Sequence, residues 1–334
     1  MAALTPRSVA IVGLGTIGGS LALALTRAGW TVRGDAANAR DRAAAYRRGI
    51  YIAPGSGTAR IANLVKGVEM VVLSVPPGEL ARVAAEVAAV VPATIPILHT
   101  SSIQSQKPLG LSPELARRLT ATHPLAGAAG RGFAAAREDL FVDCQVSVAV
   151  PASLGARRAA VALWKAVGAH DILACHAEEH DARMRWVSHL PQLAATALAA
   201  ALSDAGVPAT SMGPGGRDTT RLAQSPWPLW HALLSMNPKA SAYPIRLLEA
   251  ELHALRMALE HGDMDKVGRI WRSAALWRSG DVVQFSGELP IMASAKPTTR
   301  LKAQRKPAAK RAAKAASRPV RHARTSSASR RKTK

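Results

Sequence analysis

The sequence predicts an α/β domain of the Rossmann-like type with a mostly parallel sheet, followed by an all-α domain and a disordered basic tail. Three observations predict this: apolar runs alternate with helical patterns early in the chain, strand patterns stop near residue 176, and Lys, Arg, Ala, Ser and Pro dominate after residue 288. We therefore expect a dinucleotide-binding domain over residues 1–175, a helical domain over 176–288 and a tail over 289–334.

Short apolar runs bounded by turn residues predict the strands of the first domain. They cover residues 8–12, 31–34, 70–75, 95–98, 119–122, 145–150 and 171–174. Helical patterns occupy gaps between them, including residues 20–28 and 156–167. Beyond residue 176, Ala, Leu and Met recur at helical spacing to about residue 278, which predicts a bundle of helices.

The charge is concentrated at the C-terminal end. The formal net charge is +22, but residues 296–334 carry 15 Lys and Arg and no Asp or Glu, so the rest of the chain has a net charge of only +7. A segment of this composition cannot bury enough apolar surface to fold, which predicts disorder. It is either a solubilising extension or a non-specific contact for nucleic acid or another polyanion, without interleaved aromatic residues for stacking.

Cysteine usage and hydropathy indicate a cytoplasmic protein. Cys144 and Cys175 have no metal-ligand spacing and are too few for a disulfide framework, which is typical of a reducing compartment. We expect no metal. The N-terminus runs directly into a strand pattern, and the longest apolar stretch, residues 190–202, is too short to cross a bilayer.

A glycine-rich turn follows the first predicted strand. Residues 13–18 read GLGTIG and lead into a helical run. In this context Gly13 permits the tight turn, Gly15 lets the backbone approach phosphate, and Gly18 allows close packing of helix on strand. With Thr16 and Ile17 they would present the helix N-terminus to the pyrophosphate of a dinucleotide.

A carboxylate ends the second predicted strand. Asp35 lies 22 residues after Gly13, where it can accept hydrogen bonds from a ribose diol and would repel a 2'-phosphate. NAD is therefore favoured over NADP, although nearby arginines leave NADP open. Those arginines are Arg33, Arg40 and Arg42. Ser74 and Pro76 follow another strand and should line the same crevice.

His123 is the candidate base. A dehydrogenase that oxidises an alcohol needs a group to take the hydroxyl proton, and histidine is the usual one at neutral pH. His123 follows a predicted strand and begins the turn HPLAG, at the carboxyl edge where ligands bind in such sheets. From the residues alone, a surface histidine is an equally good interpretation.

Together these motifs resemble the prephenate and arogenate dehydrogenase family of tyrosine biosynthesis. The resemblance spans about residues 8–278 and rests on separate motifs in family order: GLGTIGGSL from residue 13, HPLAG from 123, LF from 140, HD from 180, SHLP from 188 and RDTTRLA from 217. It implies NAD-dependent oxidative decarboxylation of a cyclohexadienyl acid, in which the ring becomes aromatic. It also implies a homodimer formed through the helical domain.

The resemblance assigns roles to individual residues. His123 matches the histidine that assists deprotonation of the ring hydroxyl, and Ser102 matches a serine that supports this contact. Arg217 and Arg221, four residues apart, should share one helix face and form a carboxylate site, although an Arg pair alone also fits a solvated face. Arg221 is the favoured ligand of the substrate carboxylate.

Two further positions concern the substrate side chain. His189 is interpreted as a residue that positions substrate or helix, and Gln192 replaces a second histidine found in many relatives. Prephenate and arogenate differ at that point, and a neutral amide suits either. Two other departures, His99 and Gln104 where the family has Asp and Lys, weaken the case for Ser102.

Two alternatives stay open from the sequence. One is a dehydrogenase or reductase of another small acid or imine, because a cofactor fold alone does not define a substrate. The other is a catalytically impaired cofactor-binding protein whose basic tail binds nucleic acid. The motifs at His123 and Arg221 favour the family over the first alternative, whereas the departures at His99 and Gln104 and the basic tail leave the second open.

Overall fold

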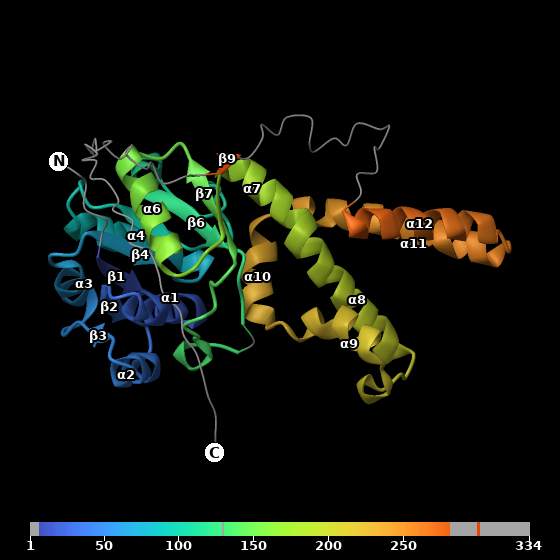
Figure 1. The fold of residues 1–334 in the computed structure, drawn as a ribbon, viewed down its shortest axis with the longest axis horizontal. Coiled ribbons are helices and arrows are strands. Elements are labelled where there is room, and N and C mark those ends of the chain that lie inside the picture. The colour runs from blue at the N-terminus through green and yellow to red at the C-terminus, as the bar shows by residue number, and fades with distance from the viewer. Residues whose placement is uncertain (1–6, 129, 281–298, 301–334) are drawn as a thin grey trace, which may run out of the picture. The chain divides into compact units, whose positions relative to one another are not determined.

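The computed structural model describes residues 7–128, 130–280, 299 and 300 (Figure 1). The first part is an α/β domain around a central sheet, and the chain is helical from residue 177 up to residue 279, apart from short connections. The change falls between β8, which ends at His176, and α7, which begins at Ala177. This arrangement confirms the predicted fold class.

Nine strands form one sheet within the described residues. Their order is β3-β2-β1-β4-β5-β6-β7-β8-β9, and the first six of these are parallel neighbours. Strand β7 is antiparallel to β6, β8 is parallel to β7, and β9 is antiparallel to β8. The strands are Ser8–Val12, Thr31–Asp35, Tyr51–Ile52, Met70–Leu73, Ile97–His99, Leu119–Pro124, Gln145–Val150, Asp171–His176 and Thr299–Arg300.

All seven strands predicted from the apolar runs are present. The sequence analysis missed β3 and β9, which have two residues each and therefore show no periodicity. Strand β9 is the only part of the predicted tail that the structure describes, and the rest of residues 289–334 lies outside the described residues.

Helices cover both faces of the sheet because alternate strand residues point to opposite sides. On β1, Val9 and Ile11 pack into the cluster that contains α1 and α6, whereas Ala10 and Val12 pack with α3 and α4. The helices of this domain are Thr16–Arg27 (α1), Ala39–Arg47 (α2), Gly57–Val65 (α3), Pro77–Val90 (α4), Pro113–Arg118 (α5) and Leu154–Ala166 (α6).

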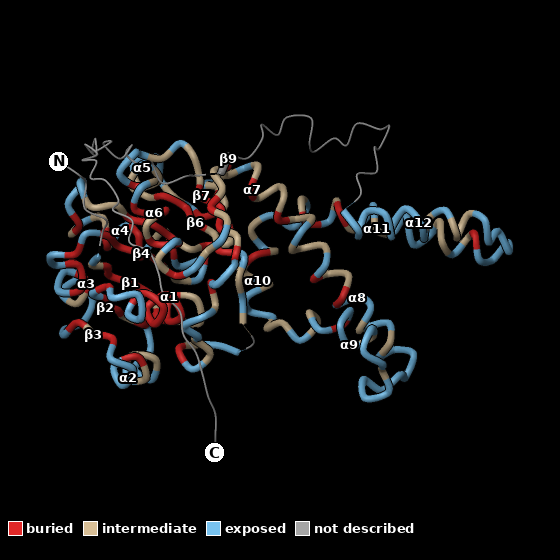
Figure 2. The backbone as a smooth tube through the Cα atoms, in the orientation of Figure 1, coloured by how far each residue is buried: buried red, intermediate tan, exposed pale blue. Residues whose placement is uncertain are grey.

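The helical region buries much less apolar surface than the sheet domain. Figure 2 shows exposed residues along much of α9, α11 and α12, while the strands are mostly buried. Helix α12 has no buried residue. The α-helices of this region are Ala177–Met184 (α7), Leu190–Asp204 (α8), Pro214–Thr220 (α9), Trp227–Met236 (α10), Pro238–Glu260 (α11) and Met264–Ser279 (α12).

A π turn joins α7 to α8. Residues Arg185–His189 are π-helical, and the flanking Met184 and Leu190 keep right-handed helical angles, so the helix runs on without a break. Pro191 lies in the first turn of α8 and cannot donate a backbone hydrogen bond. A wider turn is a common way to accommodate such a residue.

None of the helices among the described residues is long and apolar enough to cross a lipid bilayer.

Candidate active site

The glycine turn between β1 and α1 is held by close contacts that exclude side chains. Gly13 has a φ of +103°, and a Cβ there would lie 2.3 Å from the Ser74 carbonyl oxygen. A Cβ on Gly18 would lie 1.9 Å from the Gly13 carbonyl oxygen. The Gly13 amide donates to the Asp35 carbonyl oxygen over 2.8 Å, so the turn is tied to the end of β2.

Gly15 differs from these glycines because a Cβ there would meet no protein atom within 4 Å. Its φ of −80° is also allowed for any residue. Packing and backbone geometry therefore do not explain the glycine, whereas an anion resting against the backbone would. Helix α1 begins here with no acidic residue in its first turn, so its unpaired N–H groups suit a pyrophosphate.

Asp35 lies at the end of β2, as predicted, and faces a cation that the sequence analysis missed. Arg60 of α3 approaches its Oδ1 to 3.4 Å, and both side chains are about four-fifths buried. Arg33 and Arg42 are engaged elsewhere: Arg33 donates to the Lys66 carbonyl oxygen, and Arg42 to that of Ala36. Arg60 escaped notice because 25 residues separate it from Asp35.

The other predicted cofactor residues surround this turn. The Thr100 hydroxyl donates to the Ser74 hydroxyl over 3.0 Å, which joins the ends of β4 and β5, and Pro76 caps α4. Thr16 donates to the Gly132 carbonyl oxygen over 3.4 Å, and Ile17 packs against the core under α1.

His123 lies near the end of β6 and contacts a second histidine. Its Nδ1 is 2.9 Å from Nε2 of His180 in α7, and the two rings pack edge to face at 5.0 Å. The Nδ1 of His180 is in turn 2.8 Å from Oδ1 of Asp181. His180 and Asp181 form the HD motif of the family resemblance, which was given no role in the site.

Asp181 accepts two further hydrogen bonds from the segment after β5. The backbone amides of Gln104 and Ser105 donate to Oδ1 and Oδ2, each over 2.9 Å. Burial alone would raise the pKa of the Asp181 carboxyl, but the hydrogen bonds from His180, Ser105 and Gln104 outweigh it and lower the pKa overall. Asp181 is therefore a carboxylate at neutral pH.

Burial keeps His123, His99 and His189 neutral. It lowers the pKa of His123 to about 3, with a smaller contribution from the charge that His180 can carry. Burial likewise lowers the pKa of His99 to about 4, and the pKa of His189 is lowered by burial and by Arg185. A neutral His123 can accept a proton at physiological pH.

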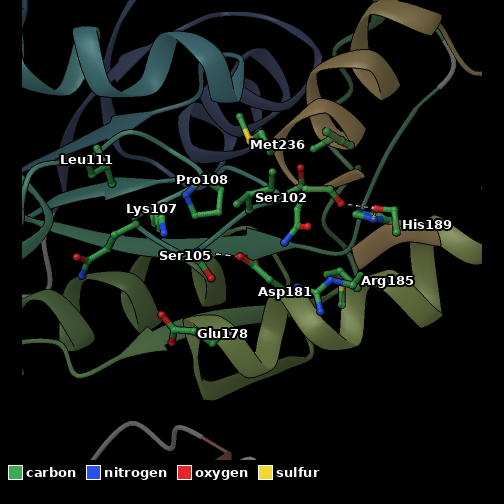
Figure 3. A pocket seen from close by; sticks show the side chains of 16 residues that line it. Ser102, Ser105, Lys107, Pro108, Leu111, Glu178, Asp181, Arg185, His189 and Met236 are labelled. Carbon is green, nitrogen blue, oxygen red and sulfur yellow. Dashed lines mark hydrogen bonds between the residues drawn. The ribbon is translucent and has the colours of Figure 1, made fainter. Parts of the chain in front are cut away.

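Ser102 and His189 line a common pocket of about 730 Å³ (Figure 3). Asp181 also borders it, so the pocket adjoins the histidine pair. Two cations that the sequence analysis missed, Lys107 and Arg185, complete its polar wall. The close spacing of these residues depends on the fold, because the pocket brings together residues 102–111 and residues 178–241.

The two predicted carboxylate ligands lie elsewhere on the surface. Helix α9 ends at Thr220, and Arg221 begins a 3-10 helix, so Arg217 and Arg221 do not share one α-helix as predicted. Both are exposed, and Arg217 donates to the Met212 carbonyl oxygen. Neither lines the pocket beside Ser102.

Gln192 is buried and holds the turn that carries Arg221. Its Nε2 donates to the Leu222 carbonyl oxygen over 2.8 Å, which joins α8 to the 3-10 helix. Its side chain is thus 5% exposed and engaged with the backbone. No group of three or more His, Cys, Asp or Glu side chains in the described part of the chain is arranged to hold a metal ion.

Comparison with known proteins identifies the family of this chain. Residues 21–173 match the family described as prephenate dehydrogenase, nucleotide-binding domain, and residues 176–273 match prephenate dehydrogenase, dimerization domain. A cyclohexadienyl dehydrogenase from Zymomonas mobilis is 30% identical over 272 residues, which are 78% of this chain and 90% of that protein.

Solved structures share the fold. The prephenate dehydrogenase of A. aeolicus, solved with hydroxyphenyl propionate and NAD+, has a TM-score of 0.74 at 23% identity, covering 83% of this chain and 99% of that one. The arogenate dehydrogenase of Synechocystis has a TM-score of 0.67 at 20% identity, covering 82% and 100%. With both domains matched in order, the chain belongs to the prephenate dehydrogenase family and is an oxidoreductase.

Proposed function

We propose that this enzyme catalyses the NAD-dependent oxidative decarboxylation of prephenate, arogenate or both. The observation that carries the proposal is His123: a neutral, largely buried imidazole near the end of β6, in the sheet whose β1 leads into the glycine turn. Membership of the family, and a relative that is a cyclohexadienyl dehydrogenase, support the substrate class.

In this proposal His123 accepts the proton of the ring hydroxyl, and Ser102 hydrogen-bonds the same oxygen. NAD, when bound against the glycine turn, accepts the hydride from the carbon that bears the hydroxyl. The ring carboxylate leaves as carbon dioxide, and the electron pair of the broken carbon–carbon bond makes the ring aromatic. The same electron pair turns the oxygen into a phenolate, which takes the proton back from His123 and becomes the phenol, so protons and electrons balance.

Basic side chains would hold the substrate carboxylates, although Arg217 and Arg221 do not line the pocket beside Ser102. We propose Arg221 as the principal ligand, with Arg217 in a lesser role. Lys107 and Arg185 border the pocket beside Ser102 and supply further positive charge. His189 would orient the substrate there. Gln192 would act through the backbone at Leu222, which positions the Arg221 turn.

Asp35 supports NAD as the cofactor, and Arg60 qualifies this preference. The carboxylate at the end of β2 would accept hydrogen bonds from the ribose diol. Because Arg60 faces the same carboxylate, it would offer a 2'-phosphate a partner if Asp35 were replaced. NADP therefore belongs in any test of cofactor preference.

We propose a homodimer formed through the helical region. The family match names a dimerization domain over residues 176–273. Large apolar side chains are exposed there, among them Trp271 at 75% and Met264 at 62%. A second copy of the chain would cover them.

For the tail we propose a weak, non-specific contact with polyanions. Its charge is the only support, since residues 296–334 hold 15 cations and no acidic residue. Retention of the full chain on immobilised DNA should fall steeply with salt, and removal of residues 303–334 should abolish it. Salt-independent retention, or retention without the tail, would contradict the contact.

The experiment that tests the enzymatic proposal follows NADH formation by the purified protein with prephenate and with arogenate. Turnover of at least one is expected, with NADP as the comparison cofactor. His123→Asn should lower kcat by about 10² or more and leave NAD binding intact. His176→Asn, at the exposed first position before α7, is the matched control. Turnover of neither substrate by the wild-type enzyme would overturn the proposal.

A further inference from the structure

Within the described part of the chain, two backbone amides and one imidazole nitrogen hydrogen-bond to the Asp181 carboxylate, and these contacts determine the directions of the bonds. A backbone N–H can only donate, so the amides of Gln104 and Ser105 require acceptors at Oδ1 and Oδ2. His180 Nδ1, 2.8 Å from Oδ1, must also donate, because a carboxylate has no proton to give.

The direction of the hydrogen bond between His180 and Asp181 determines the direction of the one between His180 and His123. A neutral imidazole has one N–H and one lone pair. When both imidazoles are neutral, a His180 with its proton on Nδ1 has its lone pair on Nε2, and the 2.9 Å contact then needs a proton on Nδ1 of His123. His123 is therefore left with its lone pair on Nε2.

The same carboxylate joins three elements of the fold. His123 is on β6, the histidine–aspartate pair is on α7, and the two amides belong to the segment after β5 that also carries Ser102. Gln104 adds a further tie, since its Nε2 donates to the carbonyl oxygen of Ser147, the residue opposite His123 on β7. His123 and the segment that carries Ser102 are therefore both positioned relative to the Asp181 carboxylate.

We propose that His180 and Asp181 are positioning residues: they fix the tautomer of His123 so that Nε2 is its basic atom, and Asp181 holds the Ser102 segment in register with it. The inference rests on the proposed function of His123 as the base. When Nε2 takes up a proton, the resulting imidazolium donates through Nδ1 to His180, and through it faces the Asp181 carboxylate. No proton needs to leave Asp181 or reach it.

The alternative is that the pair of His180 and Asp181 only stabilises the fold. Asp181→Leu separates the two because a side chain of similar size without an acceptor no longer holds the proton on His180 Nδ1, so His123 is no longer confined to one tautomer. The groups whose charges face His123 are His180, Asp181, His99 and His189, and only the one at Asp181 changes in this variant. Glu178→Gln, on the same helix and bordering the same pocket, is the matched control.

The decisive measurement is the nitrogen chemical shifts of His123 in isotope-labelled protein without substrate. We expect a protonated Nδ1 and an unprotonated Nε2 in the wild type and in the Glu178→Gln control, and a mixture of both tautomers in Asp181→Leu. A wild-type His123 protonated on Nε2, or the wild-type tautomer fully retained in Asp181→Leu, would overturn the inference. This readout does not need turnover, so it remains valid if neither substrate reacts.

Kinetics give the second readout. Asp181→Leu should lower kcat by about 10² or more with a smaller change in KM, and the acid limb of kcat/KM should move to lower pH, because the negative charge that favours protonated His123 is gone. Asp181→Glu should recover part of kcat. Loss of thermal stability with an unmoved acid limb would assign the pair a structural role instead.

Discussion

The sheet domain and the helical region differ in how much of their apolar surface they cover by themselves. In the sheet domain, Trp164 is fully buried and packs edge to face against Phe141 at 5.3 Å. In the helical region, Trp271 and Trp277 are about three-quarters exposed. The first domain covers its large apolar side chains within one chain, whereas the helical region leaves large apolar side chains exposed for a partner to cover. Cofactor and substrate residues are divided between these two kinds of structure.

The largest expected effect of a single substitution concerns the sheet domain, which contains the closely packed glycine turn. Gly18→Ala puts a methyl group 1.9 Å from the Gly13 carbonyl oxygen, so the turn must distort, and we expect a loss of about 3 kcal/mol in unfolding free energy. Gly15→Ala meets no protein atom and should leave the melting temperature unchanged, while NAD affinity falls about tenfold or more. Calorimetry and NAD titration measure both. Equal stability losses in the two variants would remove Gly15 from the phosphate site.

The next effect concerns the helical region, which carries Arg221. A lost charge-assisted hydrogen bond costs about 1.5 to 3 kcal/mol, so Arg221→Ala should raise KM for the substrate by about 10- to 100-fold. Arg217→Ala, which loses a contact to a backbone carbonyl, should have a smaller effect. Steady-state kinetics check this order. Identical KM values in Arg221→Ala and the wild type would place the carboxylates at Lys107 and Arg185 instead.

The exposed tryptophans test the need for a partner. Trp271→Ser and Trp277→Ser should each weaken the dimer about tenfold or more, since a buried aromatic anchor contributes at least 1 to 2 kcal/mol. Sedimentation across a concentration series measures the dissociation constant. Tyr46→Ser, at a residue 71% exposed on the sheet domain, is the control and should leave it unchanged. A dimer insensitive to both tryptophans would move the interface away from α12.

Acid should destabilise the buried histidines. Free imidazoles ionise near 6.5, whereas burial lowers the pKa of His123 to about 3 and that of His99 to about 4. Between these values the unfolded chain binds more protons, so stability falls as pH drops below 6.5. We expect a loss of about 3 to 4 kcal/mol from pH 7 to pH 5 by denaturant titration, roughly halved in His99→Gln. An equal loss in that variant would exclude His99 as a source.

The candidate cofactor residues could be proposed from the sequence because their signals are local. Gly13, Gly15 and Gly18 follow one strand within six residues, and Asp35 closes the next strand. Each strand long enough to show an apolar run was found, and only the two-residue strands were missed. Local patterning is sufficient where consecutive elements lie side by side.

The substrate half could not be predicted in the same way. The contact of His123 with His180 spans 57 residues, and that of Asp35 with Arg60 spans 25, so neither leaves a spacing that can be read. Arg221 was placed on a helix face because the four-residue spacing suggests one, yet the α-helix ends just before it. The family resemblance named His180 and Asp181 without revealing that the carboxylate also binds the Ser102 segment.

The π turn between α7 and α8 has a consequence for tolerance to insertions and deletions. Consecutive α-helical residues are about 100° apart, so His180 and Gln192 would point about 120° apart on an ideal helix. The turn absorbs one extra residue and reduces this angle to about 20°, and both residues are buried. A single-residue deletion within Arg185–His189 would therefore swing the whole of α8, with the turn that carries Arg221, while leaving the cofactor cleft untouched. The extra residue therefore maintains the rotational relation between α7, which carries His180, and α8, which carries Gln192.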